Sequence, residues 1–287
     1  MFGLKNLIIR GSLVIILFTS FGQAQETGAG EQTREKIFMP IGELFTPLIA
    51  DPKQPQSFIS FRKYNTPIAN VWAAAVGYGE SFGFMRWEDK LADKAFQVGI
   101  DGALFAQFNM ETASKDLVNA DYTIGFPFTF RHETFSFRVR LYHQSSHLGD
   151  EFLINTKPER VNLSYESVDT TLSKDIGAWR GYAGGEYLLQ KEPSNLDPAM
   201  IHGGLEWRGK RRILGSGKPI AGLDLKCYEE HEWSVNASFV IGLEYVRLKP
   251  CQRKLRILIE IYKGHAPHGQ FYTDRISYLG MGIYFDL

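Results

Sequence analysis

Apolar and polar residues alternate with a period of two along much of this chain, and this alternation restricts the fold more than any other feature. Between Phe96 and Phe108, every second residue is apolar or glycine, while the residues between them include Gln97, Asp101 and Gln107. The pattern returns at 121–131, 135–142, 235–245, 255–261 and 279–287. Successive side chains of a β-strand point to opposite faces, so a period of two indicates strands. The sequence predicts an all-β fold.

Three features favour an antiparallel transmembrane β-barrel over a soluble sandwich, which also alternates. The segments are about ten residues or longer, which is the length that a tilted membrane-spanning strand needs. The polar face carries many ionisable side chains, among them Arg138, Arg140 and Glu260. The last alternating segment runs to Leu287, as in barrels that the outer-membrane assembly machinery inserts. We therefore predict a protein of the bacterial outer membrane, with membrane lipids and that machinery as its partners.

Counting back from the last segment gives about twelve strands, an even number as bacterial barrels require. The strands are predicted near 69–79, 80–88, 95–108, 118–131, 134–147, 160–174, 179–190, 199–208, 219–228, 234–247, 253–263 and 274–287. The last strand must run inwards, so the predicted outer loops are 109–117, 148–158, 191–198, 229–233 and 264–273. The predicted inner turns are 131–134, 175–178, 248–252 and a longer basic one at 209–218.

The N-terminal quarter of the chain differs from the rest. Residues 1–24 are predicted to be a cleaved signal peptide, because basic residues precede a short apolar run and Ala24 stands where a signal peptidase cleaves. Residues 25–68 contain five prolines, which break strands. We expect this segment to be a periplasmic extension or an inward-folded plug, with room for a short strand at 57–64. The barrel itself is assigned to 69–287.

Composition excludes some partners and bonds. The formal net charge is +0, so no nucleic acid or other polyanion is expected to bind. The two cysteines, Cys227 and Cys251, are predicted to lie at opposite ends of the barrel, too far apart for a disulfide. The charged residues of the polar face have both signs, so we expect salt bridges that close the lumen rather than a wide channel.

Three stretches of the sequence carry a resemblance to a known family. They are 141–151 (LYHQSSHLGDE), 160–164 (RVNLS) and 264–272 (GHAPHGQFY). These stretches resemble a bacterial domain-of-unknown-function family of predicted outer-membrane barrels, and the resemblance extends from about Phe38 to Leu287. It implies a location and a fold, and no activity.

A narrower resemblance concerns chemistry. His143-Gln144-Ser145 is similar to the His-Gln-Ser of outer-membrane phospholipase A, and it fits the His-x-Ser of outer-membrane lipid A deacylases. Residues two apart lie on one face of a strand, where the imidazole can take the serine proton. His143 and Ser145 have the same parity as Phe135 and Leu141, so they are predicted on the outer wall near the rim, within reach of a lipid ester.

The third residue of such a triad is left open by the sequence. Glu159 lies on the outer face if Val161, Leu163 and Tyr165 face lipid. Asn162 lies on it instead if Val168, Thr170 and Leu172 face lipid. Odd-numbered apolar residues in the first part of this strand give way to even-numbered ones in the second part, so a bulge is expected near 166–168. The phospholipase uses an Asn here and the deacylase a Glu.

The resemblance to the phospholipase is also the only reason to consider a cofactor, calcium. Ser146-His147 stands where the phospholipase has Asn-Gly, and no cofactor is predicted otherwise. No metal site is predicted at His143, His147, Asp150 and Glu151, because their spacing matches no familiar site. Two functions are left: a barrel with a structural or transport role, or a lipid acyl hydrolase that uses Ser145 and His143.

Overall fold

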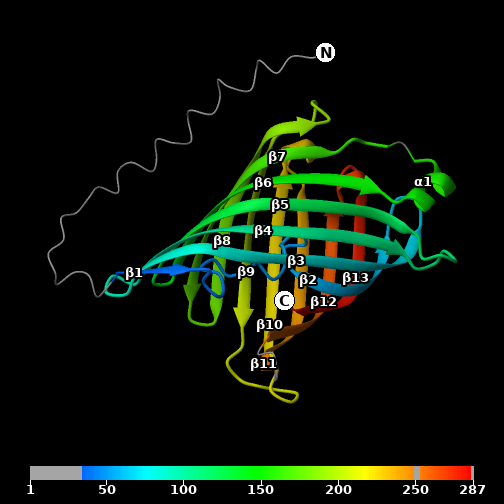
Figure 1. The fold of residues 1–287 in the computed structure, drawn as a ribbon. Coiled ribbons are helices and arrows are strands. Elements are labelled where there is room, and N and C mark those ends of the chain that lie inside the picture. Colours follow the sequence, from blue (N-terminus) through cyan, green and yellow to red (C-terminus); the bar gives the residue numbers. More distant parts are fainter. Residues whose placement is uncertain (1–33, 159, 249–252, 286–287) are drawn as a thin grey trace, which may run out of the picture.

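The computed structural model describes residues 34–158, 160–248 and 253–285, and it is a closed barrel of antiparallel strands (Figure 1). The predicted signal peptide lies outside these residues. The strands are β1 (Arg34–Phe38), β2 (Ser57–Asn65), β3 (Asn70–Asp89), β4 (Lys94–Asn109), β5 (Leu117–His132), β6 (Phe135–Leu148), β7 (Ser164–Ile176), β8 (Trp179–Glu192), β9 (Ala199–Arg208), β10 (Lys218–Tyr228), β11 (Val235–Leu248), β12 (Arg253–His265) and β13 (Arg275–Phe285). The short helices are α1 (Asp150–Thr156), η2 (Glu229–His231) and η3 (Gly269–Phe271). No helix in the described ranges is long and apolar enough to cross a membrane.

Twelve strands, β2 to β13, form the ring, which confirms the predicted strand number. Each strand pairs with its neighbours in the chain. The ring closes where β2 pairs with β13, from Ser57 opposite Phe285 to Asn65 opposite Ser277. β1 pairs with the last residues of β3 and is not one of the ring strands.

Two of the predicted strands are wrong. The segments 69–79 and 80–88 are one strand, β3, which pairs with β4 along its length except for an irregularity between Gly83 and Met85. A bulge shifts the alternation by one residue, so a single strand reads as two. The first ring strand is β2, within the segment that was assigned to an extension or plug. The barrel therefore begins at Ser57 and not at residue 69.

The exterior of the barrel is apolar. On β12, Ile257, Ile259 and Ile261 are 38–48% exposed, whereas Leu258 and Glu260 between them are 1–2% exposed. The same contrast holds on other strands. Further exposed side chains of this exterior band are Ile59, Phe61, Tyr122, Ile124, Phe126, Ile241, Leu279, Met281 and Ile283. An apolar exterior around a polar interior is the arrangement that the alternation predicts.

The interior is crossed by ion pairs between buried side chains, because a buried charge is tolerated only when it is paired. The buried arginine–carboxylate pairs that join two strands, among the described residues, are Arg62–Glu260 at 2.7 Å, Arg138–Asp169 at 3.1 Å, Arg140–Asp101 at 2.6 Å and Arg180–Glu206 at 3.5 Å. The predicted salt-bridged lumen is present in the described residues.

Residues 40–56 are named here the plug segment; Ile41 is exposed, and the segment lies inside the barrel from Leu44 onwards. Phe45 and Leu48 are fully buried, and the guanidinium groups of Arg138 and Arg180 each lie 4.7 Å from the Phe45 ring centroid. The Ile49 N–H donates to a carboxylate oxygen of Glu206 at 2.8 Å. The plug segment thus binds residues of β6, β8 and β9, and it fills the middle of the lumen.

The connections divide between two ends of the barrel. One end, named the loop end, carries the short connection 66–69 and the longer ones 110–116, 149–158 with 160–163, 193–198, 229–234 and 266–274. The shorter turns 90–93, 133–134 and 177–178 lie at the other, the turn end, together with 209–217. Cys227 is a free cysteine at the loop end of β10, and Cys251 is outside the described residues.

Candidate functional site

His143 and Ser145 lie on the exterior of β6 near the loop end. Both side chains are partly exposed, while the alternate residues Gln144 and Ser146 are buried in the interior. This orientation follows from the period of two along β6, whose pairing with β5 runs from Phe135 to Leu148 without a register shift.

The imidazole of His143 is held by a carboxylate on the neighbouring strand. His143 and Glu166 stand opposite each other in the register between β6 and β7, and His143 Nδ1 lies 3.0 Å from Glu166 Oε1. Their side chains are 41% and 47% exposed, so the pair is open to the surroundings of the barrel. A carboxylate at Nδ1 fixes the orientation of the ring and directs Nε2 to a different partner.

The predicted third residues are not the ones that contact His143. Asn162 is exposed in the segment before β7 and makes no described contact with His143. Glu159 lies outside the described residues. Glu166 takes the position instead. It lies two residues before Val168 and faces outward as Val168 does, and the register between β6 and β7 brings it opposite His143. The expected irregularity is found between Glu166 and Ser167 in their pairing with β8.

Residues with hydroxyl side chains stand on both sides of Ser145 in the sheet. Ser164 of β7 and Tyr122 of β5 stand opposite it in the two registers. The ring of His147, two residues further along β6, lies 5.8 Å from that of Tyr122. Ser145 and His143 share no hydrogen bond among the described contacts. The exterior therefore presents a serine, an imidazole oriented by a carboxylate, and neighbouring hydroxyl donors.

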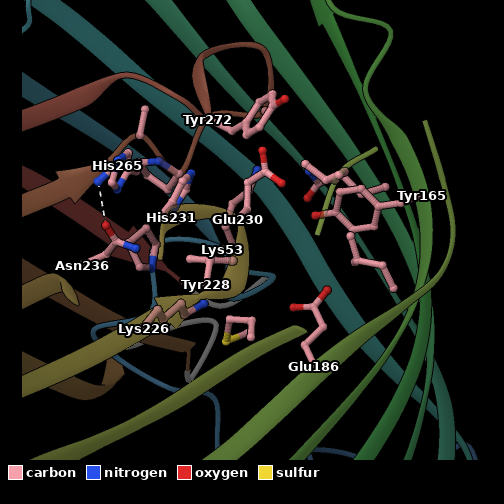
Figure 2. Close-up of a pocket in the computed structure, with 18 of the residues that line it drawn as sticks. Lys53, Tyr165, Glu186, Lys226, Tyr228, Glu230, His231, Asn236, His265 and Tyr272 are labelled. Atoms are coloured by element: carbon pink, nitrogen blue, oxygen red, sulfur yellow. Dashed lines mark hydrogen bonds between the residues drawn. The ribbon is translucent and has the colours of Figure 1, made fainter. Parts of the chain in front are cut away.

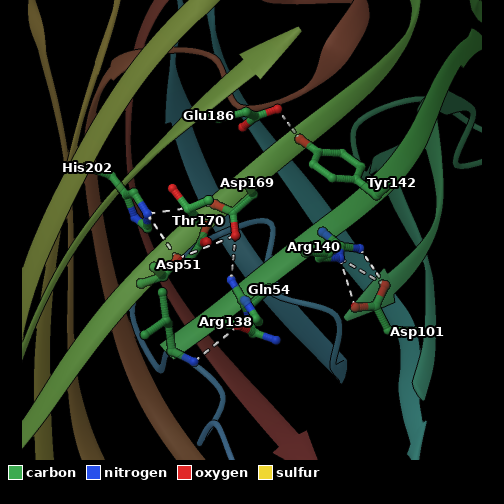
Figure 3. Close-up of polar contacts among 12 residues, drawn as sticks. Asp51, Gln54, Asp101, Arg138, Arg140, Tyr142, Asp169, Thr170, Glu186 and His202 are labelled. Carbon is green, nitrogen blue, oxygen red and sulfur yellow. Dashed lines mark hydrogen bonds and ion pairs between the residues drawn. The ribbon is translucent and has the colours of Figure 1, made fainter. Parts of the chain in front are cut away.

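The interior side of the same strand is fixed by buried contacts (Figure 3). The Arg140 guanidinium donates to both oxygens of Asp101, at 2.6–3.0 Å, and the Tyr142 hydroxyl donates to Glu186. Gly125 leaves the space for the Arg140 pair, since a Cβ there would come within 2.8 Å of both partners. Such support restricts the backbone from which the exterior side chains project.

A loop over the barrel mouth also holds β6. The Ser146 hydroxyl donates to Asp121, and the Gln270 side-chain amide donates to the Ser146 carbonyl at 3.0 Å. Next to Gln270, burial lowers the pKa of His268 to about 3, so its ring is neutral at pH 7 and hydrogen bonds with the Tyr64 hydroxyl at 3.0 Å. No group of three or more His, Cys, Asp or Glu side chains in the described part of the chain is arranged to hold a metal ion.

One family model matches nearly the whole chain, and it is described as protein of unknown function (DUF1207), over residues 23–287. No curated protein matches the chain. Among solved structures, the chain is similar to outer membrane phospholipase A from Escherichia coli, with 12% identity, a TM-score of 0.55, and coverage of 85% of this chain and 94% of that one. It is also similar to the Salmonella typhi outer membrane phospholipase dimer with bound calcium, with 10% identity, a TM-score of 0.53, and coverage of 82% and 94%. At these identities the likeness shows the fold alone, an outer-membrane β-barrel fold.

Proposed function

Since the chain belongs to the DUF1207 family, whose function is unknown, we propose a function from the site itself: hydrolysis of an acyl ester of a membrane lipid at the exterior of the barrel. In this proposal Ser145 is the nucleophile and His143 is the general base. Glu166 orients the imidazole and stabilises its protonated form.

The proposed location is the bacterial outer membrane. The exterior band of Ile, Leu and Phe side chains needs an apolar surrounding, and the similar solved structures are outer-membrane proteins. In that setting His143 and Ser145, which are near the loop end of β6, lie next to the headgroup ends of the lipids. A lipid ester can reach them from the side, without entering the lumen.

The observation that carries the proposal is the 3.0 Å contact between His143 Nδ1 and Glu166, two residues from a serine on the same face. On an apolar wall an imidazole or a carboxylate without a partner would be costly, and here each is the partner of the other. A purely structural pair would not need a serine on the same face. The Nδ1 contact leaves Nε2 to accept the proton of the Ser145 hydroxyl. That two similar structures are phospholipases is consistent with a lipid ester as the substrate.

The reaction would proceed in two halves. Ser145 Oγ attacks the ester carbonyl carbon while its proton moves to His143, and the tetrahedral intermediate releases the alcohol, which takes that proton. Water then gives its proton to His143 and attacks the acyl-serine, which releases the fatty acid and returns the proton to Ser145. Ser164 and Tyr122, which stand opposite Ser145 in the two registers, carry the hydroxyls that we propose stabilise the oxyanion.

Calcium is not assigned a step. The residue after Ser145, where the phospholipase has an Asn, is Ser146, and its hydroxyl points inward to Asp121. It therefore offers no oxygen to an ion at the exterior. An assay with and without a calcium chelator tests this point: loss of activity with the chelator would contradict it.

The test uses the full-length mature protein refolded in detergent, mixed with phosphatidylethanolamine, with release of fatty acid as the readout. We expect release by the natural sequence and none by Ser145→Ala. Glu166→Gln should be slower, and Thr170→Ala, on the same face of β7, should be unchanged. A fluorophosphonate reagent should modify the peptide that contains Ser145, as mass spectrometry would detect. If neither release nor labelling exceeds that of Ser145→Ala, the protein is a barrel without this chemistry.

A further inference from the structure

A chamber of about 130 Å³ lies in the loop-end half of the lumen, and the hydrolysis proposed above does not use it (Figure 2). Its lining includes Pro52 and Lys53 of the plug segment, and residues of β6, β7, β8, β10 and the loops at the loop end. Figure 2 shows side chains from opposite walls around this space, among them Tyr165, Glu186 and Lys226. The volume is that of a small organic molecule.

Tyrosines make up much of the wall. Those in the lining are Tyr142, Tyr165, Tyr228, Tyr262 and Tyr272. The rings of Tyr142 and Tyr165 lie 6.1 Å apart and nearly perpendicular, and the Tyr142 hydroxyl donates to Glu186. Two aromatic rings and a carboxylate are thus neighbours on one side of the chamber. The quadrupole of an aromatic ring gives its faces a negative electrostatic potential, which attracts cations.

The charges of the lining are unbalanced. Four carboxylates line the chamber, those of Glu186, Asp197, Asp224 and Glu230. The two lysines of the lining are already neutralised, because Lys53 pairs with Asp121 and Lys226 pairs with Asp51 at 2.6 Å, and neither acid belongs to the lining.

The remaining groups do not restore the balance. Burial and the neighbouring His265 lower the pKa of His231 to about 4, so His231 adds no positive charge at pH 7. Glu186 has no ion pair with any described residue. A partly buried carboxylate without a cation is costly to ionise, and a cationic ligand removes that cost.

A second, independent feature points to a ligand. Asn236 lines the chamber and is 3% exposed, and its side-chain oxygen accepts from the His265 N–H at 2.6 Å. Its Nδ2 has no hydrogen-bond partner among the described residues. Buried donors are nearly always bonded in folded proteins. Asn236 is therefore a buried donor in the chamber wall without an acceptor among the described residues.

We propose that the chamber binds a small organic cation that also carries an oxygen acceptor, of the amino-alcohol type. The ammonium group binds beside Glu186 against the rings of Tyr142 and Tyr165, and Asn236 supplies a donor for the oxygen. An inorganic cation fits less well, because the described residues contain no cluster of three or more metal-ligating side chains. A neutral ligand leaves the carboxylates without a counter-charge.

Choline is the probe, and dimethylbutanol, its uncharged carbon isostere, is the control for shape. Equilibrium dialysis of radiolabelled choline against the detergent-purified full-length protein should give saturable binding, which excess isostere does not displace. Glu186→Gln should weaken binding roughly tenfold or more, a loss of about 1.4 kcal/mol. Glu151→Gln, on the exposed side of α1 and away from the chamber, should bind as the natural sequence does.

The outcomes separate cleanly. Absence of saturable choline binding overturns the proposal, and so does equal competition by the isostere. Circular dichroism and heat-modifiable migration in gels establish whether Glu186→Gln folds. If it does not fold, Tyr165→Leu decides, since it removes an aromatic face without touching a charge: unchanged affinity there refutes the proposed position of the ammonium group. Ser145→Ala should bind choline normally, so this result is independent of hydrolysis at the exterior.

Discussion

Replacement of Arg140 by leucine is predicted to destabilise the barrel strongly, because it breaks the ion pair behind the candidate site. The guanidinium donates three hydrogen bonds to Asp101, and the two side chains are 8% and 6% exposed. Removing one partner of a buried pair costs about 3–5 kcal/mol, because the other charge stays buried without a partner. The guanidinium also lies 4.4 Å from the Tyr142 ring centroid, a contact worth about 0.5–2 kcal/mol. We expect a loss of about 4 kcal/mol in the free energy of unfolding.

The assay is equilibrium unfolding in urea from detergent micelles, followed by tryptophan fluorescence. The double variant with Asp101→Leu and Arg140→Leu should recover most of the loss, because it leaves no unpaired charge, and replacement of a buried pair by apolar residues is often neutral. Arg140→Lys, which keeps the charge but loses the two-pronged geometry, should fall between. If Arg140→Leu costs less than about 1 kcal/mol, or if the double variant is no more stable than the single one, the charged interior is not held by pairing as argued.

Three further predictions concern the lumen, the loops and the cysteines. In planar bilayers the protein should show no large steady conductance, and deletion of residues 40–56 should create one; a conducting natural sequence would contradict the filled lumen. His231 has a folded pKa of about 4 against 6.5 when unfolded, so the unfolded chain binds more protons between these values, and the stability that neutral His231 contributes above pH 6.5 is lost as the pH falls towards 4. The hydrogen-exchange protection factors of 229–234, which are corrected for the pH dependence of the intrinsic exchange rate, should therefore fall on acidification, and His231→Phe should remove part of that effect. The mass of the intact protein should not change with reductant; a change would mean that Cys227 and Cys251 are bonded.

The ring of strands could be predicted from the sequence because its signal is local. A period of two in a single segment is enough to identify a strand and its exterior face, as for His143 and Ser145. The errors arose where the local signal is interrupted. The irregularity between Gly83 and Met85 divides β3 into two apparent strands, and the prolines before Ser57 conceal that β2 belongs to the ring.

The partner of His143 could not be predicted in the same way. Glu166 has the outward parity of Val168, so its face could be read from the sequence. Its position opposite His143 depends on the register between two strands joined by a long loop, and a single strand carries no information on that register. The chamber is less predictable still, because its lining combines side chains from the plug segment, several strands and loops.

The seam between β2 and β13 has a consequence for how the chain folds. It joins the first and last ring strands, so the contact that completes the ring is also among the most distant in sequence, and we expect it to form after the intervening hairpins. The plug segment ends directly before Ser57, so it is tethered to the strand that docks last against β13. Enclosure of the plug segment and closure of the wall are therefore expected to occur in one late step. Until that step, β2 and β13 both present unpaired edges, which is the state in which chains of this kind are most prone to aggregate.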